Sequence, residues 1–115
     1  MNVCLLTPTF LPKIGGVEMV VAALGEQYQR LGASPQVVTQ WPRKGRGTPD
    51  DNAMAYPVIR YRRPWSFTWR LGMASITRAL ETAWRKQPFD IIHCHLAYPA
   101  GFVAMRFAKK HNIPV

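Results

Sequence analysis

The sequence is short of cysteine, acidic residues and long apolar runs, and each shortage excludes a class of protein. No apolar run approaches the ~20 residues that a membrane-spanning helix needs. The N-terminus carries neither the basic region nor the cleavage site of a signal peptide. The 2 cysteines, Cys4 and Cys94, both lie in apolar, strand-like stretches. We therefore expect buried thiols in a reducing compartment, which predicts a cytoplasmic protein rather than a disulfide-stabilised one.

Acidic residues number only 6 against 15 lysines and arginines, so the formal net charge is +9. This bias favours anionic partners, namely phosphates, nucleic acid or acidic lipid, and does not by itself choose among them. Apolar residues make up 48% of the 115 residues, which is enough for the core of one small domain.

Strand-like and helix-like stretches alternate along the chain. The strand patterns cover residues 2–7, 36–40, 58–61, 89–95 and 111–115, and the helix patterns cover 17–31, 66–86 and 100–110. The apolar face of the first helix is expected to contain Val17, Val20, Val21, Leu24, Tyr28 and Leu31. Residues 42–57, rich in proline, glycine and charge, are expected to form an exposed loop. The alternation predicts an α/β fold with an open, mostly parallel sheet and helices on both faces.

Two adjacent glycines, Gly15 and Gly16, precede the first helix-like stretch. In a parallel sheet this loop lies at the carboxyl edge, where the helix points its free N–H groups and ligands bind. Glycines would let a phosphate or sugar approach that backbone, but a tight turn with a positive φ explains the pair equally well. Neither the dinucleotide-binding G-x-G-x-x-G pattern nor the P-loop pattern is present. Glu18 suits the positive end of the helix dipole.

His93 and His95 alternate on a strand-like stretch, so we expect them to face the same side of the sheet. A His-x-His pair can bind zinc, but His111 is remote and Cys94 points the opposite way, so we predict no metal site. His95 is expected at the carboxyl end of its strand, where it could contact a substrate hydroxyl or act as a base. His93 is expected to be a hydrogen-bonded core residue.

Residues 60–70, RYRRPWSFTWR, interleave arginines with aromatic residues. This pattern is compatible with a solvated helix face beside the core, with a membrane interface or with nucleic-acid binding. We expect no nucleic acid, because no DNA- or RNA-binding motif accompanies the charge. At an anionic membrane the contacts would come from Arg60, Arg62, Arg63, Trp65 and Arg70.

Two segments resemble glycosyltransferases of the GT-B fold, family-4 type. LLTPTFLPKIGGVEMVVAALGEQYQRLG is similar to their opening strand, proline-containing loop, Gly-Gly pair, acidic residue and long helix. PFDIIHCHLAYPAGFVAMRFAKKHNIPV is similar to their D-[IV]-[IV]-H-x-H strand, Ala-rich helix and short strand. The resemblance covers most of the chain except about 42–66. Ala33 departs from the pattern, which has His or Asn after the glycine that ends the first helix.

The resemblance implies that residues 1–115 are the truncated, Rossmann-like first domain of a GT-B fold, on the acceptor side of an interdomain cleft. The full enzyme would move a sugar from a nucleotide-sugar to a sugar or lipid-linked acceptor, with retention of configuration and without a metal or other cofactor. Gly15 and Gly16 would face the donor phosphate. His95 is the predicted catalytic residue because of its place at the carboxyl end of its strand.

Because the resemblance places the donor nucleotide on a second domain, the 115-residue chain alone is expected to be inactive. Family members also attach peripherally to membranes, which here implies the inner face of the plasma membrane. The alternative is a small basic α/β module that binds phosphate ligands or anionic membrane without catalysis. A nucleic-acid binder is the third hypothesis.

Overall fold

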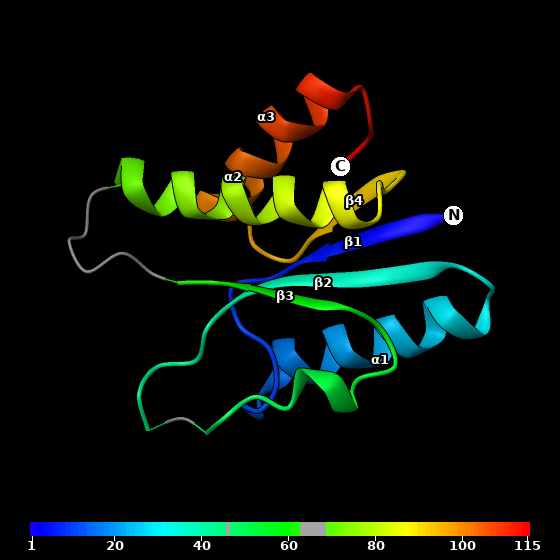
Figure 1. Cartoon of the computed structure of the whole chain (residues 1–115), viewed down its shortest axis with the longest axis vertical. Coiled ribbons are helices and arrows are strands. Elements are labelled where there is room, and N and C mark those ends of the chain that lie inside the picture. The colour runs from blue at the N-terminus through cyan, green and yellow to red at the C-terminus, as the bar shows by residue number, and fades with distance from the viewer. Residues whose placement is uncertain (46, 63–68) are drawn as a thin grey trace.

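The computed structural model describes residues 1–45, 47–62 and 69–115, with the side chain of Trp69 left aside (Figure 1). The strands are β1 (Asn2–Leu6), β2 (Ser34–Gln40), β3 (Val58–Tyr61) and β4 (Ile91–Cys94). The helices are α1 (Gly16–Arg30), α2 (Trp69–Lys86) and α3 (Phe102–His111), with a short 3-10 helix, η1 (Asp51–Ala53), before β3 and a π-helical turn, η2 (Ala97–Gly101), before α3.

The four strands form one parallel sheet in the order β3-β2-β1-β4. Helix α1 covers one face, and α2 and α3 cover the other (Figure 1). The predicted α/β fold, an open parallel sheet of Rossmann-like type with helices on both faces, is therefore confirmed. Because the strands all run the same way, the loops that follow them meet at one edge, the carboxyl edge of the sheet.

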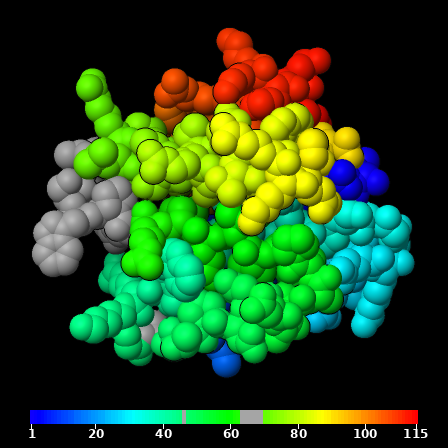
Figure 2. Space-filling view, viewed as in Figure 1, coloured from blue at the N-terminus to red at the C-terminus, as the bar shows by residue number. Residues whose placement is uncertain are grey.

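The larger part of the core lies between the sheet and helices α2 and α3, which pack side by side on the outer surface (Figure 2). The sheet contributes alternate apolar residues, because successive side chains of a strand point to opposite faces. Trp84 meets Phe89 edge to face, with ring centroids 5.0 Å apart. The fully buried members include Cys4, Leu6, Val38, Leu80, Ala83 and Ile92.

Half of the apolar face predicted for α1 is confirmed, since Val21 is buried and Leu24 and Tyr28 pack against the core. Val17, Val20 and Leu31 are instead exposed, and Glu18 is buried beside the loop that precedes α1. Gly25 is also buried. The reason is Tyr56, which is 4% exposed and packs on Gly25 so closely that a Cβ there would lie 2.5 Å from the tyrosine ring. The segment 42–57 is thus only partly the exposed loop that was expected.

The strand predicted for 111–115 is absent. Helix α3 continues through His111 and ends where Asn112 adopts a left-handed conformation with φ 55°. The N–H of Ile92 donates to the carbonyl of Pro114 at 3.0 Å, so this segment runs beside β4. Proline has no N–H with which to return such a bond, and no ladder forms there.

Candidate functional site at the carboxyl edge

The loop between β1 and α1 crosses the carboxyl edge of the sheet. The N–H of Thr7 donates to the carbonyl of Val38 at 3.0 Å, and the Thr7 hydroxyl donates to the carbonyl of Thr9 at 2.9 Å, which fixes the start of the loop. At its other end Gly15 is the N-cap of α1, and no side chain caps the helix there. The first N–H groups of α1 therefore face the edge where ligands of parallel sheets bind.

Neither Gly15 nor Gly16 is explained by a turn. Gly15 is extended, with φ −168°, and the described glycines with a positive φ are Gly32, Gly45 and Gly47. Any residue can adopt an extended backbone. The tight-turn interpretation therefore does not hold, and each glycine needs another reason.

Gly15 is explained by Glu18. A Cβ at Gly15 would lie 2.6 Å from the Oε2 atom of Glu18, a carboxylate in a side chain that is 4% exposed. Burial acts to raise the pKa of Glu18, but hydrogen bonds from its own N–H, from the Thr9 side chain and from Lys13 lower the pKa below its usual value. The Nζ atom of Lys13 lies 3.4 Å from Oε1. Glu18 thus does more than complement the helix dipole, because it joins both ends of the loop.

Gly16 has no such internal reason. A Cβ placed on it would meet no atom of the described residues within 4 Å, and the residue is exposed at the start of α1. The backbone is therefore open to approach from outside at the positive end of a 15-residue helix.

His93 and His95 stack on the α1 side of the sheet, with ring centroids 4.5 Å apart, as their alternation predicted. The hydroxyl of Tyr28, from α1, lies 3.2 Å from Nδ1 of His93, so His93 is the hydrogen-bonded member of the pair. His95 follows the last residue of β4, and its N–H donates to the carbonyl of Leu6 at 2.9 Å.

The imidazole of His95 retains unused hydrogen-bonding capacity. Its Nε2 atom is buried and has no hydrogen-bond partner among the residues that the structure describes. Burial, followed by the neighbouring His93, lowers the pKa of His95 below its usual 6.5. The ring is therefore neutral at pH 7 and can accept a hydrogen bond or a proton.

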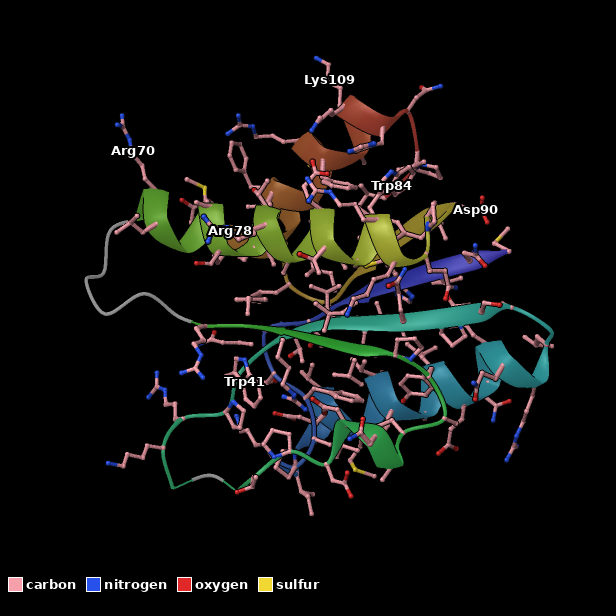
Figure 3. The ribbon with its side chains drawn as sticks, viewed as in Figure 1. Trp41, Arg70, Arg78, Trp84, Asp90 and Lys109 are labelled. Carbon is pink, nitrogen blue, oxygen red and sulfur yellow. The ribbon has the colours of Figure 1, made fainter. Side chains whose placement is uncertain are left out.

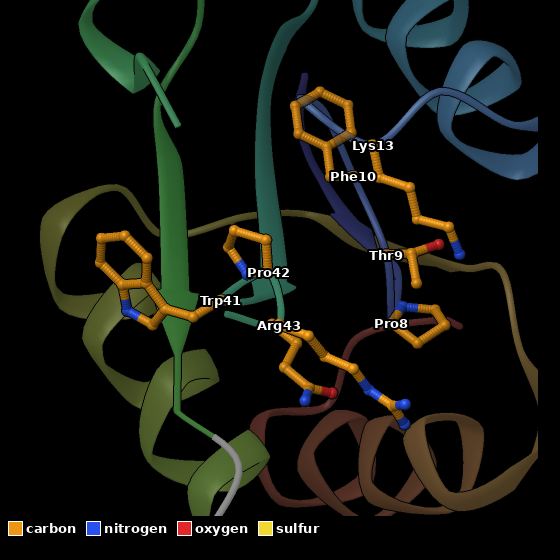
Figure 4. Close-up of a pocket in the computed structure, with 8 residues that line it drawn as sticks. Pro8, Thr9, Phe10, Lys13, Trp41, Pro42 and Arg43 are labelled. Carbon is orange, nitrogen blue, oxygen red and sulfur yellow. The ribbon is translucent and has the colours of Figure 1, made fainter. Parts of the chain in front are cut away.

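A pocket of about 350 Å³ lies between the β1–α1 loop and the end of β2 (Figure 4). Its lining residues come from two segments that are distant in sequence: Pro8, Thr9, Phe10, Lys13, Gln40, Trp41, Pro42 and Arg43. Gly15, Gly16 and His95 are not among them, although Lys13 connects the pocket to Glu18 and so to Gly15. The sequence predictions missed the pocket. The basic stretch that follows β2 was the available signal.

The arginines assigned to a membrane contact separate in the structure. Arg60 is a correction, because its side chain is only 2% exposed. Its guanidinium donates to both carboxylate oxygens of Asp51, at 2.8 and 2.9 Å, and to the carbonyl of Leu11. It therefore ties η1 and the β1–α1 loop to the end of β3 instead of facing a partner.

Arg62 and Arg70 are exposed, with Arg62 5.7 Å from the centre of the Trp41 ring and Arg70 pointing away from the sheet at the start of α2 (Figure 3). Arg63 and Trp65 lie outside the described residues.

Metal-binding and membrane-spanning features are absent from the described parts of the chain. No group of three His, Cys, Asp or Glu side chains in residues 1–45, 47–62 and 69–115 could hold a metal ion. Within the same ranges no helix is both long and apolar enough to cross a membrane. Burial raises the pKa of both Cys4 and Cys94, so these thiols stay protonated.

Comparison with known proteins identifies the family of this chain. No curated protein matches the chain. Residues 15–115 match the family model described as a glycosyl transferase 4-like domain. The match begins at the glycine pair, includes β4 with His93 and His95, and covers well over half of the chain. It supports a glycosyltransferase-type enzyme, in agreement with the resemblance to the family-4 type of the GT-B fold. The chain belongs to the glycosyl transferase 4-like domain family.

Proposed function

We propose that this chain is the acceptor-side domain of a glycosyltransferase that moves a sugar from a nucleotide-sugar to a sugar or lipid-linked acceptor. The observation that carries the proposal is Gly16, an exposed glycine at the start of α1 that no internal contact requires. There the donor phosphate approaches the backbone, and the free N–H groups stabilise the charge that develops on the leaving phosphate. Gly15 contributes by making room for Glu18, which holds the loop.

His95 acts on the acceptor in this proposal. Its neutral ring stands just past β4 at the same edge of the sheet, and its buried Nε2 atom lacks a partner among the described residues. The half-buried residue lies at this edge of the sheet, where it orients the acceptor hydroxyl toward the sugar. The reaction retains the configuration of the sugar and needs no metal, since the charge on the phosphate is met by backbone N–H groups and cationic side chains.

A second, nucleotide-binding domain completes the proposed site, so residues 1–115 alone bind ligands without transferring sugar. The protein acts in the cytoplasm. An anionic membrane surface is a proposed partner, because cationic side chains outnumber the single carboxylate, Glu81, around an open groove of about 570 Å³ between α2 and α3, and only Lys110 among them is paired with Glu81, at 2.7 Å. The groove is lined in part by Met73, Val103 and Phe107, and the cations are Arg70, Arg78, Arg106 and Lys110. Binding of anionic membrane without catalysis is the second candidate function, and the +9 charge favours it.

The test is Gly16→Leu in the full-length protein. The leucine side chain should block the donor phosphate and lower transfer at least about 100-fold, the scale on which lost electrostatic stabilisation acts. The free energy of unfolding should be unchanged, because a Cβ at Gly16 meets none of the described atoms.

The matched control is Gly72→Leu, on α2, where a Cβ also meets no described atom within 4 Å. It should leave transfer intact. Full activity in Gly16→Leu would reject the proposed role of the loop, and anionic liposome binding without any transfer by the full-length protein would favour the second candidate.

A further inference from the structure

The pocket beside the glycine loop has a cation on each of two opposite walls. Lys13 belongs to the β1–α1 loop, and Arg43 follows β2. In Figure 4 the guanidinium of Arg43 extends from its strand end toward Pro8, which lies on the other wall. An anion between the walls could be reached from both sides.

No carboxylate lines this pocket, and two carboxylates of the adjoining segments already have partners. Glu18 holds Lys13 from beneath the loop at 3.4 Å, and Asp51 is held by the buried Arg60. Arg43 is exposed and makes no ion pair with any residue that the structure describes. Arg43 therefore gives the pocket one positive charge that no described residue neutralises. Lys13 is paired with Glu18, but its side chain is 49% exposed and its ammonium keeps further N–H donors for a ligand.

The remaining lining suits a compact polar ring rather than an apolar chain. Thr9 and Gln40 offer hydroxyl, amide and carbonyl groups, while Phe10 and the two prolines supply short apolar surfaces. The ring of Trp41 points away from the other labelled residues, toward β3 (Figure 4), and lies beneath Arg62. A volume of about 350 Å³ is at the small end of ligand pockets.

We propose that this pocket binds the acceptor through an anionic group, a phosphate or carboxylate on a sugar, held between Lys13 and Arg43. The proposal rests on the proposed transferase function and adds to it the chemical class of the acceptor. Lys13 links the two parts of the site, because Glu18 contacts it and also lies against Gly15. The acceptor is thus held by the same loop that leads into Gly15 and the start of α1. Arg43 is the specificity-determining residue, and Glu18 is a positioning residue for Lys13.

The experiment measures direct binding by calorimetry to the full-length protein, using glucose 6-phosphate, glucuronate, glucose and inorganic phosphate as probes. The two anionic sugars should bind more tightly than glucose and more tightly than phosphate. Arg43→Gln should weaken the anionic sugars at least about tenfold, the size of one charged hydrogen bond, and leave glucose unaffected. Arg62→Gln is the matched control, because it removes one exposed positive charge that does not line the pocket.

Equal losses in Arg43→Gln and Arg62→Gln would show a general charge effect and overturn the proposal. Inorganic phosphate binding as tightly as glucose 6-phosphate would also overturn it, because the sugar would then contribute nothing. The transferase function and the acceptor pocket are tested by separate measurements, of transfer and of binding. Gly16→Leu should abolish transfer and still bind the anionic sugars. Transfer by Arg43→Gln at the wild-type rate would refute the acceptor pocket and leave the transferase function standing.

Discussion

On the face of the sheet covered by α2 and α3, the buried side chains are almost all apolar. The face covered by α1 instead holds the buried Glu18, the buried Arg60 and the Tyr28–His93 pair. Arg60 belongs to this face because its neighbours in β3, Ile59 and Tyr61, pack into the opposite core. The same four strands form both faces, because alternate residues of a strand point to opposite sides of the sheet. The two faces differ in the chemical type of the side chains that they bury.

The difference separates two sources of stability. The α2/α3 face is stabilised by apolar area removed from water, which is non-directional and needs only well-packed volume. On the α1 face each buried charge depends on a specific partner, since a buried charge without one is costly. Partnered polar groups also hold backbone and side chains in fixed positions, which a binding site requires. The candidate site accordingly lies where the α1 face reaches the carboxyl edge.

The largest effect is expected on the apolar face. Leu80 is fully buried between α2 and the sheet. Changing it to alanine should lower the free energy of unfolding by about 2–5 kcal/mol, because the variant loses buried methyl groups and leaves a cavity. Urea denaturation measures it. Leu71→Ala, on the exposed side of the same helix, should stay within about 0.5 kcal/mol. If Leu80→Ala also lowered the free energy of unfolding by no more than about 0.5 kcal/mol, the two faces would not differ as described.

A smaller and more specific effect is expected at the glycine pair. Gly15→Ala should destabilise by about 0.5–1.5 kcal/mol, because its Cβ would lie 2.6 Å from the Glu18 carboxylate, which must then move away from a hydrogen-bonding partner. Gly16→Ala should cost nothing, since its Cβ meets no described atom within 4 Å. In a double-mutant cycle, Gly15→Ala should cost much less in a Glu18→Ala background. Additive costs would show that Glu18 is not the reason for Gly15.

The sequence predicted the features that depend on neighbours along the chain. Four of the five predicted strand-like stretches are strands of the parallel sheet, and the two-residue period of a strand placed His93 and His95 on one side. The helices followed from their 3.6-residue period, although only part of the buried face of α1 did. That face depends on Tyr56, which reaches Gly25 from a loop that looked exposed.

The features that were missed join residues far apart in sequence. Arg60 resembled its exposed neighbours in a basic segment, and only the fold brings it against Asp51 and the loop carbonyl of Leu11. Lys13 and Arg43 line one pocket because β1 and β2 are adjacent strands, which the order of elements alone does not fix. Glu18 was assigned to the helix dipole because nothing local indicates that its carboxylate folds back over Thr9 and Lys13.

The smallest effect sharpens the comparison at the edge of the α1 face, where His95 lacks a partner among the described residues. Its pKa should lie below 6.5 in an NMR titration, with the resonance assigned by His95→Gln, because burial and then the adjacent His93 disfavour the charged ring. Because the pKa of His95 is lower in the folded than in the unfolded protein, the neutral ring contributes stability that is fully present above pH 6.5. This stability is lost as the pH falls through the folded pKa. Replacing His93 with glutamine should raise the pKa of His95 only in part, since burial remains. A pKa at or above 6.5 would mean that water reaches the ring and would remove the argument for a neutral acceptor of the substrate proton.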